Sequence, residues 1–448
     1  MGYFNAQAVN NSTTTTATQE KPPKCVHNNG GALCESNYMD DDRANFDDVA
    51  WDRNDEAWEE SKISFQCVSI IRKIESFVTQ KFGKTATWVT PMWVGGYNNI
   101  YRVRIEGSDD VVIRLPQPSL AQFPNEKTLR EAATANFITQ NTQVPVARVL
   151  FHGLSNPDSE VGPFIVIQHV ENCGTMSHAL MMPNERDPTE AHMLNPGISE
   201  DVLESFYNKG AVHFLQLLEP SFPRRLSTFG FIEDDWSAQS KNQTTTLSPA
   251  PSGFSSFRLW CDVLRAGNIL LNEANDIVAI VDWEFAYIAP TQFALDPPWW
   301  LLLNVPEMWH TNIDDWTKIY DVRLKTWLRA VEKAEESAKT KSNRFKVSIY
   351  MQESWETGRF WLNYAARKSW AFDTIFWKYL DERFFGSREG DIAKQDLWKT
   401  RVHLLSERER SAMESFVERK MEESKDRILV DWDDEQVKVR LAEVLFED

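Results

Sequence analysis

Cysteine is scarce in this chain. Five of the 448 residues are cysteine, an odd number at scattered positions, and no secretory signal precedes them. They are Cys25, Cys34, Cys67, Cys173 and Cys261. This usage argues against a disulfide framework and indicates a reducing compartment, so we expect a cytoplasmic protein.

Long apolar runs and an excess of basic residues are also lacking. No apolar run approaches the roughly 18 residues of a membrane-spanning helix, so no membrane association is expected. Lys and Arg number 48 against 66 Asp and Glu, a net charge of −18. A nucleic-acid partner is therefore not expected, whereas a small and cationic substrate is compatible with this charge.

Aromatic residues, by contrast, are abundant. The 18 Trp and 26 Phe cluster in stretches such as PPWWLLL and RFWLNYAARKSWAFDTIFWKY. Core packing between helices is favoured over a cation-binding aromatic cage by roughly three to one, because aromatic side chains usually supply buried area.

The chain divides by composition into a polar leader and two further parts. Residues 1–40 are too polar to bury a core and are predicted to be disordered. In residues 41–170, helical periodicity over 62–82 is followed by three strand-like runs, a helix over NEKTLREAATANFITQN, and two more strands. This order predicts a small antiparallel sheet that carries one main helix.

Helical patterns dominate the last part, residues 171–448. The stretch SEDVLESFYNKGAVHFLQLLE is an example, and residues 236–252 are predicted to be a flexible insertion. The fold class expected is therefore α+β, with a small sheet-containing lobe and a larger, mainly helical lobe.

Three motifs in the first lobe are suited to a nucleotide. Gly95 and Gly96 form a turn between two strands, where a missing Cβ lets backbone approach a phosphate, although a plain hairpin turn is the commoner meaning. Arg114 can reach phosphates if Glu131 of the next helix holds it, and a surface Arg is the alternative. The segment Gln168–His169–Val170 could present backbone groups to an adenine edge, or could be an ordinary strand exit.

The strongest motif is the pair GNILL and IVDWEFA. Asn268 and Asp282 lie at the edges of two apolar strand-like runs that are joined by the turn NEANDI. A hairpin would place both side chains on one rim, and such oxygen donors suit Mg²⁺ bound to phosphates.

Seven stretches together carry a family resemblance. In order they are GGYNNIYRV, VVIRLP, REAATANFI, GPFIVIQHVENCG, LRAGNILL, IVDWEFAYIAP and LDPPWW. The set resembles the aminoglycoside phosphotransferase and choline kinase-like family, in particular fungal members of unassigned substrate, over roughly residues 60 to 385.

The resemblance implies a two-lobed protein-kinase-like fold with ATP in the cleft. It implies that Gly95 and Gly96 belong to the phosphate loop, and that Arg114 stands where most members have Lys, with Glu131 as its partner. It also implies that Asn268 and Asp282 bind the metal. Asp296 would brace the catalytic loop from beneath, and it could also cap the helix that begins near PPWW.

The catalytic loop departs from the family pattern. The usual catalytic Asp stands five positions before the Asn, and here that position is Val263, with Asp262 one place earlier. Fungal relatives often have a Cys-Asp-Asp loop, so this chain either lost the second acid or has a bulged loop that brings Asp262 to the phosphate. Loss of a general base typically costs about 10²- to 10⁴-fold in rate.

Two hypotheses follow. The favoured one is an ATP- and Mg²⁺-dependent phosphotransferase that acts on a hydroxyl or amine of a small molecule, for which an amine or amino alcohol is a candidate. The alternative is a pseudokinase-like protein that binds a nucleotide or metabolite without turnover. The acceptor would lie in the aromatic segment 299–385, where Glu307, Asp314 and Asp315 could attract an amine or could simply be helix-start carboxylates.

Overall fold

A computed structural model provides the structure. It describes a set of ranges within the chain, namely residues 7–8, 48–117, 120–121, 123–154, 161–183, 192–220, 227–232, 235–240, 257–260, 264–284, 286–338, 346–368, 371–390 and 392–426.

The first lobe is built around an antiparallel sheet with the strand order β1-β2-β3-β4-β6-β5. Its elements are β1 (Gln7–Ala8), α1 (Asp48–Phe65), α2 (Val68–Phe82), β2 (Ala86–Val94), β3 (Asn98–Ile105), β4 (Val111–Pro116), α3 (Pro124–Asn141), β5 (Val149–Gly153) and β6 (Phe164–Gln168). The predicted succession of three strands, a helix and two strands is confirmed.

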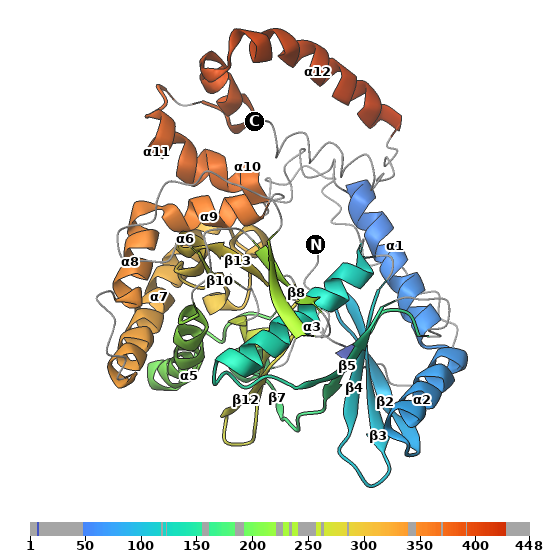
Figure 1. The fold of residues 1–448 in the computed structure, drawn as a ribbon. Helices are drawn as coiled ribbons and strands as arrows, with labels where there is room; N and C mark the ends of the chain where they lie inside the picture. The colour runs from blue at the N-terminus through green and yellow to red at the C-terminus, as the bar shows by residue number, and fades with distance from the viewer. Residues whose placement is uncertain are drawn as a thin grey trace.

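Alternation along β4 gives the sheet two distinct faces. Val111, Ile113 and Leu115 pack with Ile74 and Val78 of α2 in one hydrophobic core. The side chain between the last two, Arg114, points to the opposite face, where it meets α3. Figure 1 shows α2 on the outer side of the sheet and α3 between the sheet and the second lobe.

The helix predicted over residues 62–82 is two helices in the structure. α1 begins at Asp48 and ends at Phe65, and Cys67 has an extended backbone before α2 starts. Tyr101 Oη donates to the Phe65 carbonyl at 2.7 Å. This bond satisfies a carbonyl at the end of α1, so the chain can turn without leaving that group unpaired.

The second lobe is mainly helical and contains short sheets. Its first elements are β7 (Gly174–Thr175), α4 (Met176–Leu180), α5 (Glu200–Leu218), β8 (Ser227–Ile232), β9 (Asp235–Ser240), β10 (Phe257–Trp260), η4 (Ala266–Asn268), β11 (Ile269–Leu271), β12 (Ile277–Ile280) and β13 (Tyr287–Pro290). Within the described residues the strand orders are β10-β13-β8-β9 and β12-β11-β7.

Helices continue from there to the last described residue. They are α6 (Thr291–Ala294), η5 (Trp299–Leu302), η6 (Pro306–Met308), α7 (Ile313–Ser337), α8 (Val347–Thr357), α9 (Arg359–Arg367), α10 (Phe372–Ile375), η8 (Phe376–Leu380), α11 (Asp381–Phe385), η9 (Lys394–Leu404) and α12 (Glu407–Asp426). The predicted α+β fold with two lobes is confirmed.

The aromatic residues of this lobe pack in its interior. Trp316, Trp327 and Tyr320 are among the largest fully buried side chains, and Trp361 stacks on Tyr379. These residues are part of the core, as the favoured interpretation of the aromatic clusters predicted.

Two predicted disordered or flexible segments are partly ordered. Gln7 and Ala8 of the leader pair with Val94 and Trp93, and the first residues of the segment 236–252 belong to β9, which pairs with β8. The backbone hydrogen bonds of these residues come from neighbouring strands, and a polar sequence does not predict such pairing. The other residues of both segments lie outside the described part of the chain.

Candidate functional site

Arg114 lies at the centre of the interface between the two lobes. One nitrogen of its guanidinium, Nη1, forms an ion pair with Glu131 of α3. The other, Nη2, lies 2.5 Å from Asp282 Oδ1 in the second lobe. The two predicted partners are thus in contact, and Asp282 joins them as a further carboxylate. The buried Nε of Arg114 has no hydrogen-bond partner within the described chain.

Asp282 directly follows the hairpin that sequence analysis predicted. β11 and β12 pair in antiparallel fashion, and Val281 N–H donates to the Asn268 carbonyl at 3.0 Å. Arg265 contacts both predicted metal ligands, with Nε 3.2 Å from Asn268 Oδ1 and Nη2 3.8 Å from Asp282 Oδ2. The two oxygen donors therefore lie on one rim, as the hairpin implied.

Asp282 has an unusual backbone conformation and a lowered pKa. Its φ is 72°, in the left-handed region that few residues other than Gly adopt. Burial by itself would raise its pKa, but Arg114 and Arg265 outweigh burial and hold the pKa below the usual value. Its side chain is still 25% exposed, so an ion can approach a carboxylate that stays ionised.

A second ionic contact lies beside the first, and sequence analysis missed it. Lys127 of α3 forms an ion pair with Glu284, and Asn98 Nδ2 donates to Glu284 Oε2 at 2.9 Å. Sequence spacing could have indicated this contact, because Lys127 is one helical turn before Glu131 and Glu284 is two residues after Asp282.

The glycine turn lies close to this second contact. Gly95 N–H donates to the Asn98 carbonyl at 2.8 Å, and Gln117 Nε2 donates to the Gly95 carbonyl at 2.9 Å. A Cβ at Gly95 would stand 3.3 Å from the Asn98 oxygen, whereas one at Gly96 would meet nothing within 4 Å. Close packing therefore favours a glycine at position 95 and leaves position 96 open to a larger residue.

The segment Gln168–His169–Val170 leaves β6 next to β4. Gln168 N–H donates to Arg148 and His169 N–H donates to Asp110, at 2.9 and 3.1 Å. Val170 accepts from Asn172 Nδ2 at 2.9 Å. Two backbone N–H groups of the segment predicted to lie beside an adenine are thus engaged within the protein, and a base would have to bond to other groups of the segment.

Asp296 joins helices of the second lobe. Its carboxylate accepts from Ser354 Oγ at 2.5 Å and from Asn363 Nδ2 at 2.7 Å, and Arg367 Nη1 lies 4.0 Å away. The N-cap of η5 is Pro298, so the proposed capping role for Asp296 is wrong. The role predicted from the family resemblance, bracing of the catalytic loop, stays a prediction.

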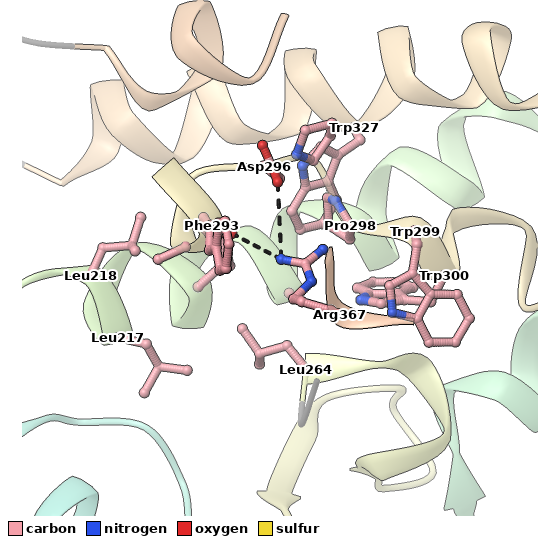
Figure 2. Close-up of a pocket in the computed structure, with 14 residues that line it drawn as sticks. Leu217, Leu218, Leu264, Phe293, Asp296, Pro298, Trp299, Trp300, Trp327 and Arg367 are labelled. Carbon is pink, nitrogen blue, oxygen red and sulfur yellow. Dashed lines mark hydrogen bonds and ion pairs between the residues drawn. The ribbon is translucent and has the colours of Figure 1, made fainter. Parts of the chain in front are cut away.

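Asp296 also lines a cavity next to that loop. The cavity has a volume of about 60 Å³ and lies between α5, the 293–300 segment and Leu264 at the start of the described loop. Figure 2 shows Arg367 between Asp296 and Leu264, with its guanidinium directed toward Asp296 and the Phe293 carbonyl. Asp262 and Val263 lie outside the described residues.

The acidic residues considered for an amine acceptor differ in their surroundings. Asp314 and Asp315 lie in the first turn of α7, where Asp314 pairs with Lys378 at 2.6 Å and Asp315 lies 3.3 Å from Lys318. These two are helix-start carboxylates, the alternative meaning of the sequence pattern. Glu307 is buried and accepts from Tyr364 Oη.

The residues at the lobe interface fit a magnesium–nucleotide complex. Asn268 and Asp282 supply an amide and a carboxylate oxygen, which are hard donors suited to Mg²⁺. The unpartnered Nε of Arg114 is a donor for a phosphate oxygen. Guanidinium groups now contact these oxygens, Arg114 at Asp282 Oδ1 and Arg265 at Asn268 Oδ1, so metal binding requires both contacts to give way.

Comparisons with known proteins add limited information. No family model matches the chain. A stretch of 130 residues is 26% identical to the altered inheritance of mitochondria protein 9, mitochondrial, of Debaryomyces hansenii. The match covers 27% of this chain and 20% of that protein, so the chain spans about a fifth of the length of this relative.

The solved structures found to be similar are small-molecule phosphotransferases. A type I macrolide 2′-phosphotransferase is 10% identical, with 72% of this chain and 99% of that chain covered and a TM-score of 0.38. A thermostable aminoglycoside phosphotransferase APH(4)-Ia mutant, bound to ADP and hygromycin B, is 12% identical, with 70% and 100% covered and a TM-score of 0.37. These values are too low to assign a family.

None of the helices in the described ranges is both long and apolar enough to cross a bilayer.

Proposed function

We propose that this chain is an ATP- and Mg²⁺-dependent phosphotransferase that acts on a hydroxyl or amine of a small molecule. The observation that carries the proposal is Arg114, which bridges Glu131 and Asp282 across the lobes while its own Nε has no partner among the described residues. A purely structural buried cation would be expected to use all its donors.

Each residue at the interface has a role in this proposal. Arg114 orients the phosphates, and Glu131 holds Arg114 in place. Asn268 and Asp282 hold Mg²⁺, which when bound supplies charge neutralisation to the phosphates. The backbone near Gly95 lies over the phosphates, and the 168–170 segment lies next to the base.

The acceptor is proposed to enter from the second lobe, beside the loop that contains Asp262 and Val263. A candidate acceptor is an amine or amino alcohol, in keeping with the net charge of −18. Asp262 would orient the acceptor and take its proton if the loop bulges by one residue. Positioning and charge neutralisation contribute most to this chemistry, so turnover with a poorly placed acid would be slow.

A nucleotide-binding protein without turnover is the second candidate. Val263 at the position of the usual catalytic Asp favours it, because a valine can neither accept a proton nor orient a hydroxyl. Both candidates require the same Mg·ATP site.

The first test is a thermal-shift titration with ATP, with and without Mg²⁺. Wild-type protein should be stabilised by about 2.7 kcal/mol when Mg·ATP is present at a hundred times its dissociation constant. Asp282→Asn should lose this shift, whereas Asp276→Asn, an exposed residue on the same hairpin, should keep it. Absence of any shift in the wild type would overturn both candidates.

Two further variants, Asp262→Ala and Val263→Asp, separate the two candidates when ADP release is followed across amino alcohols, aminoglycosides and sugars. Turnover that is lost in Asp262→Ala indicates a bulged and working loop. Turnover that emerges only in Val263→Asp indicates a protein that binds nucleotide and has lost catalysis.

A further inference from the structure

Lys127 is a buried cation in contact with three different segments. Its side chain is 7% exposed. Nζ donates to Asn98 Oδ1 at 2.8 Å, forms an ion pair with Glu284, and lies 3.9 Å from Glu131 Oε2. Lys127 therefore connects α3 to β3 and to the loop after Asp282.

Asn98 extends this connection to the glycine turn. Its amide uses both ends, because Oδ1 accepts from Lys127 and Nδ2 donates to Glu284 Oε2. Its carbonyl accepts the Gly95 N–H. The position of the glycine turn is thus tied to the same ion pair, across 186 residues of sequence between Asn98 and Glu284.

Lys127 differs from Arg114 in what it can offer a ligand. Arg114 has an unpartnered Nε and contacts the partly exposed Asp282. The ammonium of Lys127 is surrounded by acceptors from Asn98, Glu284 and Glu131, so binding a phosphate would require these contacts to be given up. A direct role in phosphate binding therefore does not fit Lys127.

Two connections thus run in parallel between α3 and the 282–284 loop. One passes from Glu131 through Arg114 to Asp282. The other passes from Lys127 to Glu284, with Asn98 in contact with both. If Asp282 binds a metal, the first connection weakens, because the metal ion and the Arg114 guanidinium compete for the same carboxylate.

We propose that Lys127 is a positioning residue that keeps α3 and the Glu284 loop joined while Arg114 leaves Asp282 for the phosphates. The inference rests on the proposed function. Without Lys127, the release of Asp282 by Arg114 would remove the remaining ionic connection between α3 and the 282–284 loop, and the site would lose its geometry when metal enters.

The test compares Lys127→Met with wild-type protein by calorimetric titration of ATP, with and without Mg²⁺. Met keeps the apolar stem and removes the charge. We expect Mg·ATP affinity to fall by about 10- to 100-fold, the usual effect of losing a group that supports metal ligands. Affinity for ATP without Mg²⁺ should change much less, because Asp282 then stays with Arg114.

Lys209→Met is the matched control. Lys209 of α5 forms an inter-element ion pair with Asp276 on the other side of the same hairpin, at 2.8 Å. Its loss should leave the ratio of the two affinities unchanged. A general loss of stability in Lys127→Met would lower both affinities or the melting temperature, but would not change the Mg²⁺ dependence selectively.

If the single variant fails to fold, the double variant Lys127→Met/Glu284→Gln provides the test, because it removes both charges of this ion pair. The positioning role predicts that the double variant folds and still binds Mg·ATP weakly. Wild-type affinity in the double variant, or in folded Lys127→Met, would overturn this inference alone. Failure of the wild type to bind Mg·ATP would instead overturn the proposed function.

Discussion

Glu307 is a carboxylate buried within the aromatic second lobe. It lies in η6 and accepts from Tyr364 Oη, at 2.9 and 2.8 Å to its two oxygens. Burial raises its pKa from 4.5 to about 7. Desolvation disfavours the charged form, and a backbone hydrogen bond, the Tyr364 hydroxyl and the charge of Lys368 only partly offset it.

This shift should make the stability of the protein depend on pH. Between pH 4.5 and 7 the folded state keeps a proton that the unfolded state has released, so stability should fall as pH rises through that interval. The total loss is about 3 kcal/mol. Glu307→Gln should match the wild type near pH 4 and exceed its free energy of unfolding by up to about 3 kcal/mol near pH 8.

Urea unfolding at several pH values measures this difference. The exposed Glu356→Gln on α8 is the control, and it should leave the pH dependence of the wild type intact. A constant difference between Glu307→Gln and the wild type from pH 5 to 8 would contradict the prediction.

At the level of elements, α5 is a well-capped helix with a glycine in its buried face. Ser199 caps its start, with Oγ accepting from Val202 N–H. Gly210 faces Trp327 and lines the cavity next to Leu264. Its φ is not in the left-handed region, so nothing in the backbone requires a glycine there.

Gly210→Ala should therefore stabilise the protein. An added Cβ would lie 3.8 Å from Trp327 Cζ3, an ordinary contact that uses part of the cavity. Alanine in a helix interior is better than glycine by about 0.5–1 kcal/mol. The melting temperature should rise by roughly 2–4 °C per kcal/mol.

Gly83→Ala is a control that should lower the stability of the protein instead of raising it. Gly83 ends α2 with φ 65°, and a Cβ there would meet nothing within 4 Å, so only backbone strain is added. Calorimetry should show a lower melting temperature for Gly83→Ala and a higher one for Gly210→Ala. A decrease in both would show that the space beside Gly210 does not accept a methyl group.

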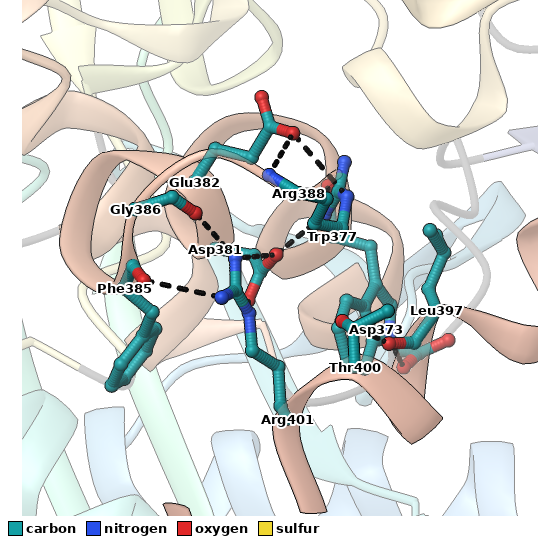
Figure 3. Close-up of polar contacts among 10 residues, drawn as sticks. All are labelled: Asp373, Trp377, Asp381, Glu382, Phe385, Gly386, Arg388, Leu397, Thr400 and Arg401. Atoms are coloured by element: carbon teal, nitrogen blue, oxygen red, sulfur yellow. Dashed lines mark hydrogen bonds and ion pairs between the residues drawn. The ribbon is translucent and has the colours of Figure 1, made fainter. Parts of the chain in front are cut away.

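On the scale of the whole molecule, a buried carboxylate takes part in attaching the last described segment to the second lobe. Asp381 of α11 is fully buried and binds two arginines. Arg401 of η9 contacts it through Nε at 2.7 Å and Nη2 at 2.9 Å, and also donates to the Gly386 and Phe385 carbonyls. Figure 3 shows Arg401 reaching from η9 toward Asp381 and these carbonyls.

Arg401→Met should loosen η9 and α12 from the rest of the protein. Removing Arg401 leaves the buried Asp381 carboxylate with less compensating charge, and Arg388 should offset part of that loss. Hydrogen exchange across residues 394–426 should become faster, while α5 should be unaffected. Lys399→Met removes an exposed pair on the same helix and should change neither.

Much of the fold could be predicted because local patterns specify it. Alternating apolar residues identified β2 to β6, and helical spacing identified α3 and α5. The β8–β9 hairpin was missed because it depends on pairing with neighbouring strands. The helix break before Cys67 was missed because the carbonyl of Phe65 finds its partner, Tyr101, 36 residues away.

The sequence by itself determined the candidate residues of the proposed magnesium–nucleotide site. It did so through the spacing of Asn268 and Asp282 on one hairpin and through the alternation that directs Arg114 toward Glu131. Only the tertiary structure decided that Arg114 holds Asp282 and that Lys127 reaches Glu284. Residue type and spacing act within one element, whereas buried charges find their partners only when packing excludes water between separate elements.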